Sequence, residues 1–82
     1  MSEREVQFNF NLSADFNGYV VRHPEILRGV SSDSCIVFSD PAHPGLSGKN
    51  ILMGTKVARK EKKKCFVAVK TGRQWKVEPI KK

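Results

Sequence analysis

Two short apolar runs stand out in this chain, Cys35-Ile36-Val37-Phe38 and Cys65-Phe66-Val67-Ala68-Val69. Both are rich in branched and aromatic residues and follow polar stretches, which is typical of buried strands. A third run, from Trp75 to Glu78, alternates apolar with polar residues and stops before Pro79. Because Lys70 to Gln74 has the composition of a hairpin connection, the last two strands should pair in antiparallel fashion.

The spacing of apolar residues in the N-terminal segment fits both a strand and a helix. A strand pattern alternates at Val6, Phe8, Phe10 and Leu12. A helical pattern also fits, because five apolar residues lie within about 120° of a helical wheel: Phe8, Leu12, Phe16, Tyr19 and Val20. The helix accounts for more of the aromatic residues, so we predict a helix over residues 8 to 22, while the state of residues 6 to 12 stays open. Ser13 or an earlier polar residue should cap it, and it should end near Arg22, because the residue before Pro24 disfavours helical geometry.

A second helix is predicted from about Leu46 to Glu61, after a loop rich in Pro and Gly. Its predicted core face consists of Leu46, Met53, Gly54, Val57 and Ala58. The opposite face carries a basic stripe within about 100° of the wheel, formed by Lys49, Lys56, Arg59, Lys60 and Lys63. Gly54 lies on the apolar side, where it would allow a close approach to the sheet.

These elements predict a small single α/β domain over residues 1–82, with two helices packed on a short mixed sheet in the order helix, strand, helix, strand, strand. A helix joins the first two strands, so they should be parallel with a right-handed crossover. A sheet of three strands leaves one face thinly covered and an edge strand with unpaired amides, which makes self-association a hypothesis to test.

The charges are sorted along the chain. Residues 42 to 82 hold twelve Lys or Arg and two acids, whereas residues 1 to 41 hold three and six. A basic half of this kind favours an anionic partner, with RNA or DNA first in line. The candidate nucleic-acid-binding residues are Lys56, Arg59, Lys60, Lys62, Lys63, Lys64, Arg73 and Lys76. The alternative is a solvated helix face whose lysines keep a small protein soluble.

Other chemistry has little support in the sequence. Gly45 to Asn50 has two residues between its glycines and Asn after Lys49, so it fails the triphosphate pattern, although the amides at a helix start could hold an isolated phosphate. His23 and His43 each adjoin a proline, without a ligand spacing around them. Asp40 follows a strand, where it could face a ligand or form a turn. We expect Trp75 to belong to the core rather than to a base-stacking surface.

Cys35 and Cys65 each open an apolar run without CxxC spacing, so they are expected to be buried thiols rather than a redox or zinc pair. No metal, cofactor or catalytic constellation is indicated. No apolar run approaches the roughly 20 residues that cross a bilayer, and Met1 to Glu5 lacks the features of a signal peptide. We therefore expect a cytoplasmic protein that does not enter the membrane.

The stretch Asn11-Leu12-Ser13-Ala14-Asp15-Phe16-Asn17-Gly18-Tyr19-Val20-Val21-Arg22-His23-Pro24-Glu25 resembles the opening of a family of small prokaryotic proteins of unknown function. The Asn-led helix at Asn50-Ile51-Leu52 and the two apolar strands follow in the same order. The chain departs from that family in lacking acidic residues in the turn at Ala42 to Gly45 and in its heavier lysine run. The resemblance supports the first helix and transfers no activity or ligand.

The leading hypothesis is therefore a non-catalytic binding module for nucleic acid backbone or another polyanion. The alternative is a protein-interaction module, either a homodimer or a module for another protein, that uses the uncovered sheet face or the aromatic first helix.

Overall fold

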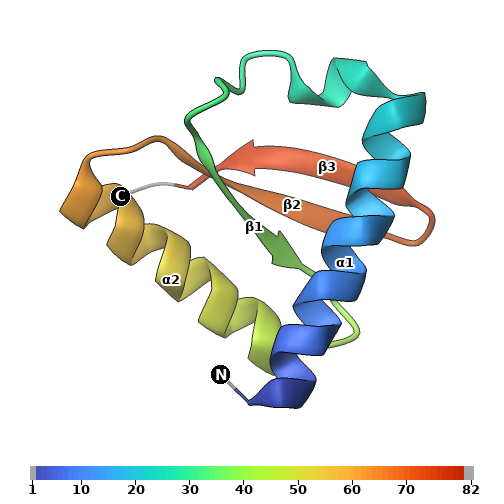
Figure 1. The fold of residues 1–82 in the computed structure, drawn as a ribbon, viewed down its shortest axis with the longest axis horizontal. Helices are drawn as coiled ribbons and strands as arrows, with labels where there is room; N and C mark the ends of the chain where they lie inside the picture. The colour runs from blue at the N-terminus through green and yellow to red at the C-terminus, as the bar shows by residue number, and fades with distance from the viewer. Residues whose placement is uncertain (1, 81–82) are drawn as a thin grey trace.

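The computed structural model describes residues 2–80, which form two α-helices, one short 3₁₀ helix and three strands (Figure 1). In chain order these are α1 (Glu3–Arg22), η1 (Pro24–Leu27), β1 (Cys35–Ser39), α2 (Pro44–Glu61), β2 (Cys65–Thr71) and β3 (Gln74–Pro79). The predicted order of helix, strand, helix, strand, strand is confirmed.

Helix α1 begins earlier than predicted, because Ser2 and Glu5 form a capping box. The Ser2 hydroxyl accepts a hydrogen bond from the Glu5 amide at 3.2 Å, and the Glu5 carboxylate accepts one from the Ser2 amide at 3.1 Å. Residues 6–12 are therefore helical, which decides the question that the alternating pattern left open. The helix ends at Arg22, as the proline at position 24 predicts.

The sheet has the strand order β1-β2-β3. Strands β1 and β2 are parallel, with Val37 opposite Val67, and β2 and β3 are antiparallel, with Ala68 opposite Val77. A two-residue turn joins β2 to β3, and Gly72 supplies the positive φ of 63° that its first position needs. Both predicted pairings are confirmed, and β1 and β3 are the two edges.

The two helices lie on opposite faces of the sheet (Figure 1). On the α1 face, Leu12 and Phe16 pack with Ala68 and Trp75 in one buried cluster, and Phe38 completes it. Because neighbouring residues of a strand point to opposite faces, Val37 points to α2 instead. Helix α2 packs mainly on β1 and less on β2, so the α2 face of β3 is thinly covered and Lys76 is exposed there.

Helix α2 approaches the sheet closely at Gly54, as its place in the sequence indicated. A Cβ atom at this position would lie 2.8 Å from Cδ1 of Ile80 and 3.3 Å from both γ-carbons of Val37. One turn later, Ala58 is 1% exposed. Small residues on the inner face of α2 therefore set its distance from β1.

The predicted core face of α2 was wrong in part. Met53 is 45% exposed, and the buried residues of the helix are Ser47, Asn50, Gly54 and Ala58. Two polar side chains can occupy this face because each has hydrogen-bond partners: the Ser47 hydroxyl bonds the backbone of Asp40, and the Asn50 carboxamide donates to the carbonyl of Phe38. Compared with the prediction, the buried face of α2 is therefore rotated toward Ser47 and Asn50 and away from Met53.

Candidate functional site

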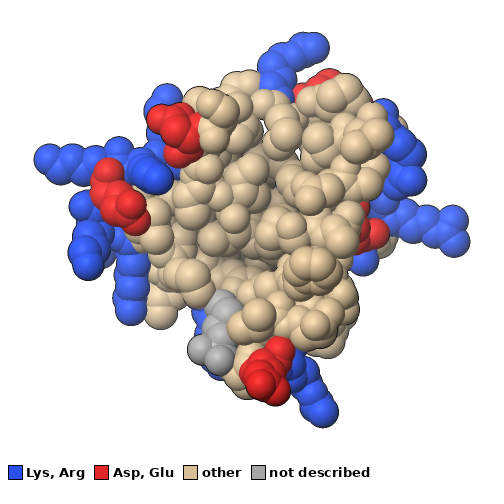
Figure 2. Space-filling model, viewed as in Figure 1, with Lys and Arg blue, Asp and Glu red and all other residues tan. Residues whose placement is uncertain are grey.

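The last turns of α2 and the loop before β2 concentrate positive charge. We define the basic cluster as the exposed residues Lys56, Arg59, Lys60, Lys62, Lys63 and Lys64. Basic residues in the last helical turn also interact favourably with the negative end of the helix dipole, so the helix tolerates them there. Figure 2 shows Lys and Arg side chains grouped at the left of the molecule, over the C-terminal end of α2.

Residue Lys62 ends α2 in a left-handed conformation, with φ 54° and ψ 35°. This conformation costs a residue with a Cβ atom about 1 kcal/mol or more, and helices usually place glycine there. Lys62 is the one non-glycine residue with positive φ among the described residues. A lysine therefore occupies a position at which glycine would be more stable.

A polar hollow of about 250 Å³ lies between the loop at Ser31 to Ser34 and the three loop lysines. Asp33 lines it and keeps a lowered pKa, because the Ser31 hydroxyl and its own backbone amide hydrogen-bond its carboxylate and the charges of Lys63 and Lys64 lie nearby. One acid therefore lies beside three cations, and the hollow remains net positive.

None of the eight predicted binding residues forms an ion pair within residues 2–80. The ion pairs there belong to other side chains: Lys49 lies 2.8 Å from Glu5, Lys70 lies 3.4 Å from Asp15, and His23 lies 3.4 Å from Glu25. Lys49, which was predicted as part of the basic stripe, is thus neutralised by α1. The side chains of the basic cluster are exposed and take part in none of these ion pairs.

The structure does not bring all eight residues together. Arg73 lies in the β2–β3 turn, beside α1, at the far end of β2 from the lysine loop (Figure 1). The seven residues of β2 separate the two ends by about 23 Å. Lys76 lies between them, exposed on β3. The site is therefore a cluster of six cations with two outlying ones.

No aromatic side chain of the basic half forms a stacking surface in the described structure. Trp75 is 3% exposed, packs edge to face on Phe16 with ring centroids 5.2 Å apart, and donates its indole N–H to Asp15 at 3.0 Å. Phe66 is half-buried on β2. Trp75 is thus a core residue, as predicted, and base stacking has no support here.

The remaining polar candidates have structural roles. The Asp40 carboxylate accepts a hydrogen bond from the Ala42 amide at 3.0 Å, so it forms the turn that leads into α2. His43 packs against Phe8 in a tilted arrangement, with ring centroids 4.0 Å apart, and His23 packs against Tyr19 in the same manner at 4.4 Å. Within residues 2–80, no group of three or more His, Cys, Asp or Glu side chains could hold a metal ion.

The two cysteines, 30 positions apart in sequence, are direct neighbours in the sheet. Cys35 pairs with Cys65 in the parallel register, and both thiols are free. Burial raises the pKa of Cys35 to about 11, and its hydrogen bond with the Cys65 thiol contributes to the shift. A neutral thiol at physiological pH is a weak nucleophile, so Cys35 has the character of a packing residue.

A family model describes nearly the whole of this fold. The model of a family of unknown function (DUF5647) matches residues 4–81. The chain belongs to this family. No curated protein and no solved structure matches the chain. Membership in DUF5647 thus confirms the expected relationship to proteins of unknown function, and it assigns no activity to the basic cluster.

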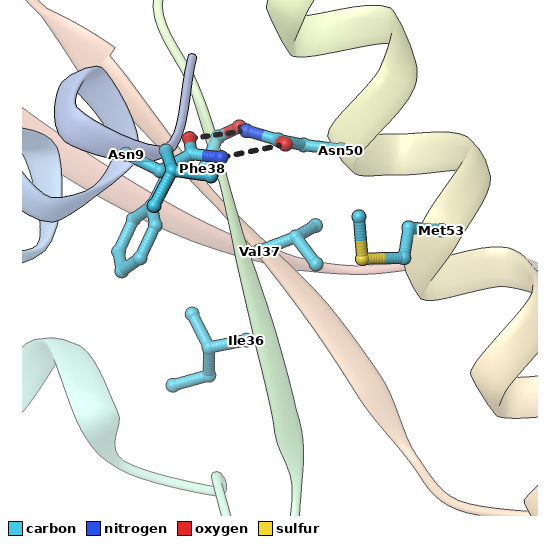
Figure 3. Close-up of a pocket in the computed structure, with 7 residues that line it drawn as sticks. Asn9, Ile36, Val37, Phe38, Asn50 and Met53 are labelled. Atoms are coloured by element: carbon cyan, nitrogen blue, oxygen red, sulfur yellow. Dashed lines mark hydrogen bonds between the residues drawn. The ribbon is translucent and has the colours of Figure 1, made fainter. Parts of the chain in front are cut away.

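The DUF5647 chain also has an apolar groove that the sequence did not indicate. It opens between α1 and α2 over the β1 edge and encloses about 330 Å³ (Figure 3). At one end, Asn9 and Asn50 exchange hydrogen bonds through their carboxamides, at 2.8 and 3.2 Å. The two residues are 41 positions apart, and only the folded arrangement of both helices shows that they meet.

No helix among the described residues is long and apolar enough to cross a membrane.

Proposed function

We propose that this protein is a non-catalytic binding module that engages the phosphate backbone of RNA or DNA, or a similar polyanion, through the basic cluster. The observation that carries the proposal is a set of six exposed cations, on one helix end and the adjoining loop, that form no ion pair within residues 2–80. Unpaired Lys and Arg side chains release condensed counterions when they neutralise phosphates, which drives binding.

The composition of the basic cluster favours contacts with the backbone over contacts with bases. Five of its six members are lysines, which lack the planar fork that reads guanine edges. The burial of Trp75 also removes the stacking contact that single-strand binders use. Binding should therefore be largely indifferent to nucleotide sequence. A cytoplasmic location, which the sequence predicts, would give the module access to RNA and DNA.

The outlying residues Arg73 and Lys76 extend this proposal to longer ligands. A separation of about 23 Å corresponds to roughly seven base pairs of duplex. A short duplex would contact the basic cluster alone, whereas a longer one could follow the sheet to Lys76 and Arg73. Removing the charge of Arg73 should thus weaken binding of long duplexes and leave binding of short ones unchanged.

The first experiment is fluorescence anisotropy of labelled single-stranded RNA and of double-stranded DNA, each at about 50 and 200 mM salt. Six phosphate contacts on duplex DNA predict a slope near −5 in a plot of log affinity against log salt, and a loss of about 10³ in affinity over this range. Absence of binding at the lower salt would refute the proposal.

Two matched sets of variants distinguish binding by the basic cluster from attraction by the net charge of the protein. Lys60→Glu, Lys63→Glu and Lys64→Glu together reverse three charges within the cluster, and Arg4→Glu, Arg22→Glu and Arg28→Glu reverse three exposed charges outside it. The first set should abolish binding and the second should preserve most of it, with folding of both checked by circular dichroism. Equal losses would mean that net charge alone attracts the ligand.

Residue Lys62 allows a test in which stability and binding change in opposite directions. Lys62→Gly relieves the left-handed backbone and should stabilise the fold by about 1 kcal/mol, while it removes one cation of the cluster. Lys62→Ala removes the same charge without relieving the backbone. Both variants should weaken polyanion binding equally, and a Lys62→Gly protein that binds as well as the parent would exclude Lys62 from the site.

A protein-interaction role is the second candidate, and one observation favours it. In the visible part of the face shown in Figure 2, charged side chains project around the rim and the centre carries neither sign. This centre lies over β1, between the two helices. In the homodimer version of this role, the mass of the protein would double with concentration across the micromolar range, which sedimentation equilibrium would detect.

A further inference from the structure

The groove between α1 and α2 is built around an exposed strand edge. Strand β1 forms its floor and Met53 of α2 contributes to one wall (Figure 3). Val6 of α1 lines the groove as well. Val6 is 55% exposed and Met53 is 45% exposed. The lining contains no Lys, Arg, Asp or Glu. The groove is thus an uncharged slot with a backbone edge at its base.

The direction of the β1 backbone groups follows from two hydrogen bonds. The Cys35 amide donates to the Lys64 carbonyl at 3.0 Å, so it points toward β2. Backbone groups alternate in direction along a strand, so those of Ile36 and Phe38 point away from β2 and into the groove. The Phe38 carbonyl confirms this, because it accepts a hydrogen bond from the Asn50 side chain at 2.9 Å instead of pairing with β2.

Three backbone groups therefore remain open along the floor: the N–H and C=O of Ile36 and the N–H of Phe38. They point away from β2, which is the strand paired with β1 among residues 2–80. Strand β1 also contains no Lys, no Pro and no bulge, three features that block pairing at many sheet edges. Alternating donors and acceptors of this kind match an extended backbone and do not match a helix, whose own groups are already paired.

A second copy of the chain fits this edge less well than a single extended segment does. Helices α1 and α2 flank the groove, so a second copy paired edge to edge at β1, about 4.8 Å away, would bring its own helices against them. Packed helices need 8–10 Å between their axes. A single extended segment brings no helix of its own into the groove, so it can lie between the walls.

We propose that this groove binds an extended, uncharged, apolar peptide segment of a partner protein, which adds to the sheet as a fourth strand beside β1. Ile36 and Phe38 supply the backbone hydrogen bonds, and the walls at Val6 and Met53 contact alternate side chains of the peptide. The Asn9–Asn50 pair bounds the site at the Phe38 end (Figure 3). This site is separate from the basic cluster and does not depend on polyanion binding.

The probe is a phage-displayed library of random heptapeptides selected against the full chain. We expect enriched peptides to be uncharged, to alternate apolar residues and to lack proline at their centre. Enriched synthetic peptides should bind Val6→Glu at least tenfold more weakly, because the carboxylate would face an apolar segment. The control is Val21→Glu, which makes the same change at a position that is 82% exposed and outside the groove, and it should bind normally.

Hydrogen exchange supplies the structural readout. On saturation with peptide, the amides of Ile36 and Phe38 should exchange at least tenfold more slowly, and RNA binding by Val6→Glu should equal that of the parent. Failure to enrich any peptide, equal peptide binding by both variants, or protection away from β1 would overturn the proposal. A dimer that Val6→Glu dissociates would assign the groove to a second copy and overturn it too.

Discussion

The indole N–H of Trp75 donates to Oδ2 of Asp15 over 3.0 Å, and the Nζ atom of Lys70 lies 3.4 Å from the same oxygen. This contact joins β3 to α1 across 60 positions of sequence, and it gives the buried indole the acceptor that it needs. An exposed residue of α1 therefore supports a buried tryptophan at the centre of the core.

Replacing Asp15 by Ala should destabilise the fold by about 1–3 kcal/mol, because it leaves the N–H of a buried tryptophan without its acceptor. Urea denaturation measures the effect. Glu61→Ala is the control, since it removes an exposed acid from the end of α2 and should change stability by less than about 0.5 kcal/mol. A neutral Asp15→Ala would mean that another group satisfies the indole.

Two glycines of α2 should respond oppositely to alanine. Nothing lies within 4 Å of a Cβ atom at Gly48, so Gly48→Ala should stabilise the fold by about 0.5–1 kcal/mol through helix propensity. At Gly54 the same methyl group would press on Ile80 and Val37, so Gly54→Ala should lose that gain or destabilise the fold. Thermal melts of both variants measure the difference. Equal stabilisation would contradict the close approach of α2 to the sheet.

The stability of the fold should decline in acid through Glu5. Its hydrogen bond with Lys49, together with that of the Ser2 amide, lowers the pKa of Glu5 from 4.5 to about 2. A carboxylate with a lowered folded-state pKa stabilises the fold above its unfolded pKa, so this contribution is complete above pH 4.5 and is lost as the pH falls toward 2. The urea midpoints of the parent and Glu5→Gln should differ at pH 7 and converge near pH 2. A constant difference would refute the assignment.

Alkylation of Cys35 should be slow in the folded protein. With a pKa near 11, only about a thousandth of this thiol is ionised at pH 8, and the thiolate is the reactive form. The rate with iodoacetamide should rise about tenfold per pH unit between 8 and 10. Because the folded pKa lies above its usual value of 9, the fold should also lose stability as the pH rises from 9 to 11. Rapid labelling at pH 7 would show an accessible, ionised thiol.

The order of elements and the strand pairing could be predicted because each follows from a local signal. Apolar runs indicated the strands, the composition of Lys70 to Gln74 indicated the hairpin, and a helix between β1 and β2 implied parallel pairing. The true start of α1 also had a local signal: Ser2 followed by Glu5 is the spacing of a capping box. The alternating apolar residues at 6–12 also fitted a strand, so the helix was predicted to begin only at residue 8.

The candidate site was less predictable, because it depends on distances across the fold. Arg73 and the loop lysines are close in sequence, yet β2 runs between them and carries them to opposite ends of the sheet. The groove depends on contacts such as Asn9 with Asn50, for which a single sequence holds no pairing signal. Met53 was assigned to the core because hydrophobicity alone does not reveal that Asn50 has buried partners.

The parallel register has a consequence for the order in which the chain folds. Every β1 residue pairs with a β2 residue 30 positions later, whereas β2 and β3 are joined by a tight turn. Closing the longer loop costs more chain entropy, so the hairpin should form first and β1 should dock later. During synthesis, β1 also leaves the ribosome before its partner strand exists. The nascent chain must therefore keep an apolar, unpaired segment from aggregating until β2 has emerged.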